Sequence, residues 1–155
     1  MKIVGHRGAK GLAPENTIAS LLKAIEHGVD EVEFDLRVTK DGEVILSHDS
    51  ELHDASGTGL IVTDHDYSEL KAHKPDLATF DEVLDKVGKQ VPLLIEIKPG
   101  VPTEPIITVI KEALGNGWTA RDFRIASYSQ PILLELHKQF PDIQKIVIEN
   151  WSGVR

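Results

Sequence analysis

The stretch Asp30-Glu31-Val32-Glu33-Phe34-Asp35-Leu36 decides how this chain folds. Its apolar residues alternate with acidic ones, which is typical of a strand, because successive side chains of a strand point to opposite faces. The apolar residues are therefore expected on a buried face, with Glu33 and Asp35 together on the other. Two carboxylates side by side in a strand are costly, because like charges repel and burial disfavours the charged form.

A bound cation would explain why Glu33 and Asp35 lie next to each other. A divalent ion removes the repulsion between two carboxylates, and hard cations such as Ca²⁺ and Mg²⁺ prefer oxygen ligands. The pair alone is equally well explained as a solvated strand face. Its assignment to a metal site therefore depends on what the rest of the chain brings to the same place.

The composition bounds the class of protein. The chain has 155 residues, 41% of them hydrophobic and 27% charged, which predicts a single soluble domain spanning residues 1–155. There is no cysteine, so disulfides, thiolate catalysis and a cysteine-ligated zinc site are excluded. The net charge of −8 disfavours a nucleic-acid partner. An anionic small-molecule substrate stays open, because a metal and a few cations can invert the potential of one cleft.

The first residues, Met1-Lys2-Ile3-Val4-Gly5, contain no long apolar run. We therefore expect neither a signal peptide nor a membrane span. The sequence predicts a cytoplasmic protein without stable membrane insertion.

Strand and helix patterns alternate along the chain. Apolar runs predict six strands, over residues 2–5, 30–36, 44–46, 91–98, 123–127 and 143–149. Helical spacing and end signals predict helices over 16–27, over 79–88, after Thr103 and from Pro131. Residues 50–76 are expected to be an irregular excursion with a short helical piece at 67–72. This alternation argues for an α/β fold with parallel strands covered by helices.

Polar residues gather where the predicted strands end. They are His6-Arg7, the Glu33 and Asp35 pair, His48-Asp49, and Glu96 with Lys98. In a parallel barrel the carboxyl ends of the strands share one rim, and that rim carries the active site. We therefore expect these four segments to meet in one cleft.

In this order and spacing, the segments His6-Arg7-Gly8, Glu15-Asn16-Thr17, Glu33-x-Asp35, His48-Asp49 and Glu96-x-Lys98 resemble the glycerophosphodiester phosphodiesterases. The resemblance covers residues 2–149. It implies a TIM-barrel-type parallel β/α fold and one divalent cation, Mg²⁺ or Ca²⁺. It also implies hydrolysis of glycerophosphodiesters, which are small-molecule substrates, to sn-glycerol 3-phosphate and an alcohol.

The same resemblance assigns His6 and His48 as the general acid and base, and leaves open which is which. Histidine suits this role because it transfers protons near neutral pH. A related possibility is a lyase-type phospholipase reaction that stops at a cyclic phosphate. A third is an inactive, truncated binding module.

The charges fit a phosphodiester. Glu33, Asp35 and Glu96 offer three carboxylate ligands, which sum to one negative charge with a divalent cation. Arg7 and Lys98 more than offset that charge and can bind the phosphate, Arg7 with a planar fork and Lys98 as a point charge.

Two neighbouring residues have alternative interpretations. Asn16 is explained equally as a helix cap or, by the resemblance, as a residue near the metal. Asp49 either orients His48 or bends the loop.

The predicted strands number six, whereas a TIM barrel has eight. The fold is therefore expected to lack the last two β/α units. Three explanations stay open: the sequence is part of a longer chain, a homo-oligomer or another partner completes the barrel, or the domain closes differently.

Overall fold

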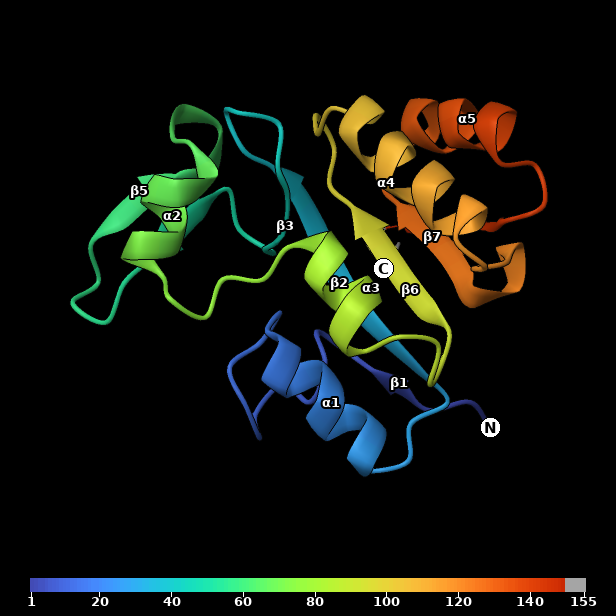
Figure 1. Ribbon diagram of the computed structural model, residues 1–155, viewed down its shortest axis with the longest axis horizontal. Coiled ribbons are helices and arrows are strands. Elements are labelled where there is room, and N and C mark those ends of the chain that lie inside the picture. Colours follow the sequence, from blue (N-terminus) through green and yellow to red (C-terminus); the bar gives the residue numbers. More distant parts are fainter. Residues whose placement is uncertain (150–155) are drawn as a thin grey trace, which may run out of the picture.

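The computed structural model describes residues 1–149, so the predicted end of the domain at residue 155 lies outside the described part. A six-stranded sheet carries the fold, and four helices pack on its apolar face (Figure 1). These helices are α1 (Ile18–Glu26), α3 (Phe80–Lys86), α4 (Glu104–Gly115) and α5 (Gln130–Gln139). The prediction of an α/β fold is confirmed.

Five strands of the sheet are parallel, in the order β1-β2-β6-β7-β8. They are β1 (Val4–Gly5), β2 (Glu31–Val38), β6 (Leu93–Ile97), β7 (Phe123–Ser127) and β8 (Gln144–Val147). A one-turn 3₁₀ helix, η2 (Ala120–Asp122), precedes β7. Each parallel crossover passes through at least one of the helices, as expected for β/α units.

The strand β3 (Val44–Leu46) departs from the expected parallel arrangement, because it pairs antiparallel with β2. It is the returning arm of a hairpin whose turn contains Asp41-Gly42. The parallel path of the described residues therefore holds five strands, three fewer than a closed barrel of eight. The expectation of six barrel strands was wrong on this point, since a strand signal does not reveal its direction.

Residues 50–76 are more regular than expected. Two short strands, β4 (Glu51–His53) and β5 (Gly59–Ile61), form a separate hairpin, followed by the 3₁₀ helix η1 (Val62–Asp64) and by α2 (Tyr67–His73). This segment lies to one side of the main sheet in Figure 1. Its small core consists of buried Leu52, Val62, Leu70 and Leu77 around Ile45. Three-residue strands carry too short an alternation to stand out in a sequence.

The predicted alternation of apolar and acidic side chains along β2 is present in the structure. Val32, Phe34 and Leu36 are fully buried and pack against the helices, while the acidic residues share the other face of the sheet. On that face Glu31 is also buried, and Arg124 of β7 binds it through contacts of 2.5 and 2.7 Å.

The turn after β1 is held tightly against α1. Gly8 has φ +81°, and a Cβ placed there would lie 2.4 Å from Ser20 Oγ and 2.7 Å from the backbone nitrogen of Leu21. Because this turn carries His6 and Arg7, its packing on α1 positions both of them.

Gly8→Ala is therefore expected to lower the free energy of unfolding by about 2–4 kcal/mol, through backbone strain and the clash with α1. Gly11→Ala is the matched control: Gly11 has φ +99°, but nothing lies within 4 Å of a Cβ there. It should cost only about 1 kcal/mol. Denaturant unfolding of both variants tests this, and equal losses would contradict the close approach.

None of the helices within residues 1–149 has the length and apolar character needed to cross a lipid bilayer.

Candidate active site

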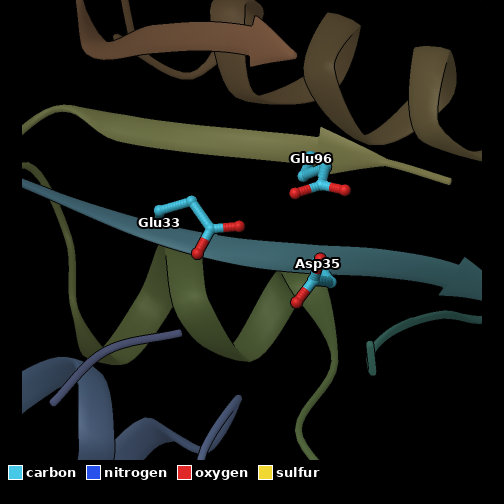
Figure 2. A group of neighbouring side chains, drawn as sticks. All are labelled: Glu33, Asp35 and Glu96. Atoms are coloured by element: carbon cyan, nitrogen blue, oxygen red, sulfur yellow. The ribbon is translucent and has the colours of Figure 1, made fainter. Parts of the chain in front are cut away.

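Three carboxylates from two adjacent strands form the centre of the site. Glu33 and Asp35 come from β2 and Glu96 from β6, where Asp35 and Glu96 are register partners. One oxygen of each residue lies within 4.8 Å of the others (Figure 2). Glu33 and Asp35 are buried and Glu96 is partly buried. The predicted ligands are thus brought together, and an oxygen-only donor set suits a hard divalent cation.

Glu33 is the least satisfied of the three. Its Oε2 accepts a hydrogen bond of 2.8 Å from the backbone N–H of Arg7, whereas its buried Oε1 has no hydrogen-bond partner within residues 1–149. Burial, and then the nearby charge of Asp35, raise the pKa of Glu33 to about 7. An orphaned, buried carboxylate oxygen facing two other carboxylates fits a cation.

Asp35 is held by more groups, although within the described residues its buried Oδ1 also accepts no hydrogen bond. The side-chain amide of Asn16 donates to its Oδ2 at 3.0 Å, and the Asn16 oxygen accepts the backbone N–H of Asp35 at 3.1 Å. Lys98 Nζ lies 2.7 Å from Asp35 Oδ1 and 2.5 Å from Glu96 Oε1. Burial lowers the pKa of Lys98, but these two contacts outweigh it, and the net shift is upward.

Arg7 connects the first turn to the carboxylates. Its Nη1 donates to Glu15 Oε1 at 3.0 Å, and its Nε lies 3.4 Å from Asp35 Oδ2. Lys10 also contacts Glu15, at 3.2 Å. Burial raises the pKa of Glu15, but its bonds to Lys10 and Arg7 more than offset this and lower it overall. Glu15 therefore orients the guanidinium group at the edge of the site.

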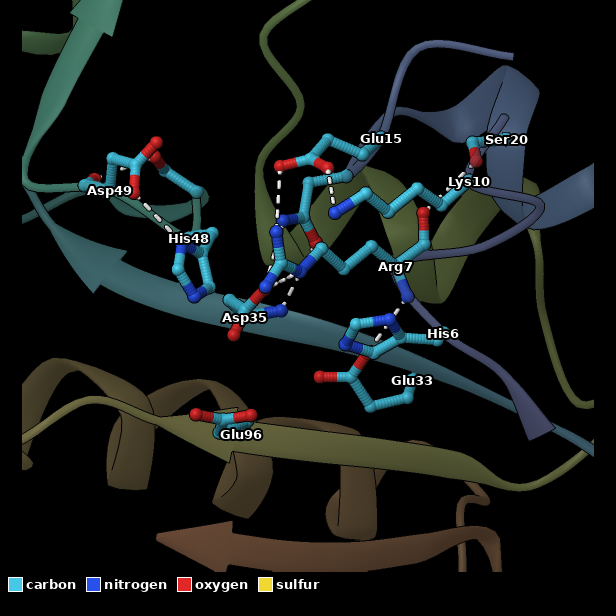
Figure 3. A network of polar contacts seen from close by, with 12 residues as sticks. His6, Arg7, Lys10, Glu15, Ser20, Glu33, Asp35, His48, Asp49 and Glu96 are labelled. Carbon is cyan, nitrogen blue, oxygen red and sulfur yellow. Dashed lines mark hydrogen bonds and ion pairs between the residues drawn. The ribbon is translucent and has the colours of Figure 1, made fainter. Parts of the chain in front are cut away.

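The two histidines stand on different sides of the carboxylates in Figure 3. His6 Nε2 lies 3.9 Å from Glu33 Oε2, and the His6 side chain is 60% exposed. Burial and then the charge of Arg7 lower the pKa of His6, which favours the neutral form of its ring. His48 Nδ1 lies 2.8 Å from Asp49 Oδ1, a contact that favours the interpretation of Asp49 as the residue that orients this ring.

His48 reaches the site by a route that differs from the predicted one. It does not follow a parallel strand, because β3 folds back along β2 and places Ser47 beside Asp35, with a backbone bond of 3.0 Å. Arg37 then donates two hydrogen bonds, of 3.2 and 2.8 Å, to the His48 carbonyl. The hairpin thus returns His48 to the level of the carboxylates.

A pocket of about 170 Å³ lies beside His48 and extends under the segment 50–76. Its lining includes Glu15, Asn16, His48, Asp49, His53 and Lys74. The segment that sequence patterns describe only as an excursion therefore forms one wall of a cavity at the site.

Asn16 is the residue whose position the sequence left undecided. Thr17, not Asn16, caps α1, since its Oγ1 accepts the Ser20 N–H. Asn16 has φ +56°, and both the amide nitrogen and the oxygen of its side chain form hydrogen bonds with Asp35. Asn adopts this left-handed backbone conformation more readily than most residues do. An Asn directly before a predicted helix is therefore a sequence signal for it.

Asn16→Gly is expected to weaken divalent-cation binding about tenfold or more, because it keeps the backbone conformation but removes the clamp on Asp35. Calorimetric titration with Mg²⁺ and Ca²⁺ measures this. Lys10→Met, which removes a contact to Glu15 rather than to a carboxylate of the centre, is the control and should bind normally. Unchanged affinity in Asn16→Gly would remove Asn16 from the site.

Comparison with known proteins identifies the family. The model of the glycerophosphoryl diester phosphodiesterase family matches residues 6–126. The chain belongs to this family. A glycerophosphodiester phosphodiesterase of Bacillus subtilis (strain 168) is 31% identical in an alignment that covers 92% of this chain. The human Lysophospholipase D GDPD1 is 36% identical over 113 residues, or 71% of this chain.

Solved structures place the chain on the same scaffold. A glycerophosphodiester phosphodiesterase from Thermotoga maritima superposes with a TM-score of 0.78 at 30% identity, covering 99% of this chain and 66% of the other. One from Agrobacterium tumefaciens gives a TM-score of 0.78 at 26% identity, covering 94% and 65%. The fold is thus of the TIM-barrel type, as expected. This family member spans 57% of the length of the Bacillus relative and 36% of the human one.

Proposed function

We propose that this protein hydrolyses glycerophosphodiesters to sn-glycerol 3-phosphate and an alcohol, with one divalent cation, Mg²⁺ or Ca²⁺. The observation that carries the proposal is the trio Glu33, Asp35 and Glu96, with an unpaired buried oxygen on Glu33. Two cationic side chains and two imidazoles adjoin it. The Bacillus relative is called a glycerophosphodiester phosphodiesterase, which supports the reaction class.

Glu33, Asp35 and Glu96 would hold the cation. When bound, the cation would polarise the phosphorus–oxygen bond and add positive charge where a phosphodiester sits. Asn16 and the Arg7 backbone keep the oxygens of Asp35 and Glu33 in place, so that they need little reorganisation on binding.

Arg7 and Lys98 would bind the phosphate oxygens. The Arg7 guanidinium is already oriented by Glu15 and Asp35, and such preorientation lowers the entropy lost on binding. Its fork can contact two phosphate oxygens at once, whereas the Lys98 ammonium acts as a point charge.

His6 would act as general base and His48 as general acid. The attacking oxygen belongs either to water or to the glycerol 2-hydroxyl. The neutral ring of His6 can take the proton from that oxygen. His48, held through Nδ1 by Asp49, would give a proton to the leaving alkoxide from Nε2. Attack by the 2-hydroxyl gives a cyclic phosphate, which water then opens.

The decisive experiment incubates the purified protein with glycerophosphocholine and with Mg²⁺ or Ca²⁺, and follows sn-glycerol 3-phosphate. Release that requires the cation supports the proposal. Accumulation of a cyclic phosphate would instead indicate a lyase, and binding without turnover would indicate an inactive binding module. Lysophosphatidylcholine is tested in parallel, because the human relative is named as a lysophospholipase D. Preference for it would assign an acylated substrate to this chain.

A further inference from the structure

The Lys98 ammonium lies among the carboxylates that are expected to bind the cation. Its Nζ is 2.7 Å from Asp35 Oδ1 and 2.5 Å from Glu96 Oε1. The Lys98 side chain is only 10% exposed. A positive charge on this protein's own chain therefore sits between two of the three predicted ligands.

The remaining groups around Asp35 are of a different kind. Asn16 and Arg7 contact its other oxygen, Oδ2; Asn16 also accepts the backbone N–H of Asp35, and Arg7 also binds Glu15. Of Asn16, Arg7 and Lys98, Lys98 is the side chain that contacts Oδ1, and it does so at the end of a flexible four-carbon stem. Its withdrawal breaks only its contacts with Asp35 and Glu96, and a cation bound to the same two carboxylates would replace both.

The ammonium satisfies the carboxylates incompletely. It forms a hydrogen bond with Glu96 but only an ion pair with Asp35 Oδ1, and within the described residues neither that oxygen nor Glu33 Oε1 accepts a hydrogen bond. A divalent cation carries twice the charge and takes six or more oxygen ligands, so it can serve all three residues. Exchange of one cation for the other therefore improves the pairing of the buried oxygens.

We propose that Lys98 is an exchangeable internal cation. It neutralises Asp35 and Glu96 while the protein is free of metal, and a divalent cation displaces it. The released ammonium then turns to the phosphate of the substrate. This inference rests on the proposed metal site and adds that Lys98 becomes available to substrate only after the metal has entered.

Chemical labelling of the protein tests the exchange. An amine-reactive reagent is applied to the metal-free protein, to the protein with saturating Mg²⁺ or Ca²⁺, and to that mixture with inorganic phosphate, with mass spectrometry of each lysine. Lys98 should react slowly at first, on the order of tenfold faster with the cation, and slowly again with phosphate. Lys111, exposed on α4, is the control and should react equally in all three.

Calorimetry with Mg²⁺ and Ca²⁺ measures cation binding directly, and so distinguishes a failure of the Lys98 exchange from a failure of the metal site. If the cation binds but Lys98 labelling does not change, the ammonium stays in place and the exchange is wrong, while the metal site stands. If neither cation binds, the metal site fails and the exchange fails with it.

Two substitutions distinguish exchange from a simple effect of charge. Lys98→Met removes the competitor and should raise cation affinity on the order of tenfold. Lys98→Arg keeps the charge but offers a bidentate fork to Asp35 and Glu96, so displacement should be harder and affinity lower than in the wild type. Affinity in Lys98→Arg equal to that of the wild type would show that only net charge matters and would overturn the exchange.

Discussion

Glu33→Gln is expected to abolish most cation binding while stabilising the metal-free protein. Glutamine keeps an oxygen that can accept the Arg7 N–H but removes one negative charge from the trio. We expect a loss of cation affinity of about a hundredfold or more, measured by calorimetry with Mg²⁺ and Ca²⁺, because a ligand contributes at least as much as the residues that orient it. Unchanged affinity would remove Glu33 from the ligand set.

The same variant changes the pH dependence of stability. Folding raises the pKa of Glu33 from 4.5 to about 7. An acid with a raised pKa binds more protons in the folded state, so the metal-free wild type should lose stability as the pH rises from about 4.5 to about 7. The shift corresponds to at most about 3 kcal/mol, which Glu33→Gln should recover above pH 7.

Thermal unfolding of the metal-free proteins between pH 4 and pH 8 measures this difference. Glu112→Gln, the same chemical change on an exposed position of α4, is the matched control and should follow the wild type at every pH. If Glu33→Gln also keeps the wild-type slope, Glu33 is not the group that titrates.

His6→Ala and His48→Ala are expected to lower kcat for glycerophosphocholine by about 10² to 10⁴, because each removes one of the two proton transfers. Cation binding should persist in both, since neither ring belongs to the carboxylate trio. His137→Ala, on the exposed surface of α5, should keep full activity. Full activity in either His6→Ala or His48→Ala would refute its catalytic role.

A change of leaving group separates the two roles. The p-nitrophenyl ester of glycerol 3-phosphate releases an anion that needs no protonation. His48→Ala, which lacks the proposed acid, should therefore recover activity on this substrate by about tenfold or more relative to glycerophosphocholine, whereas His6→Ala should not. Recovery in His6→Ala alone would exchange the two assignments.

Much of the fold follows from local patterns. The alternation in residues 30–36 separates apolar from acidic side chains before any tertiary contact is considered, and Thr79 with Glu82 marks the start of α3 by a capping box that the structure contains. The direction of β3 and the hairpin of β4 and β5 were missed. Both depend on pairing between strands of only three residues, whose patterns carry little information.

The sequence by itself determined which residues are candidates for the chemistry: two carboxylates on one strand face, a third on the next strand, and histidines at the ends of two segments. The tertiary structure alone decided how each acidic side chain is satisfied. On one face of β2, Arg124, 93 residues away, binds Glu31, and Asn16, 19 residues away, binds one oxygen of Asp35. Within residues 1–149, one buried oxygen of Glu33 and one of Asp35 accept no hydrogen bond. The physical reason is that alternation fixes the face of a side chain, but its partner comes from whichever distant segment the packed sheet brings alongside.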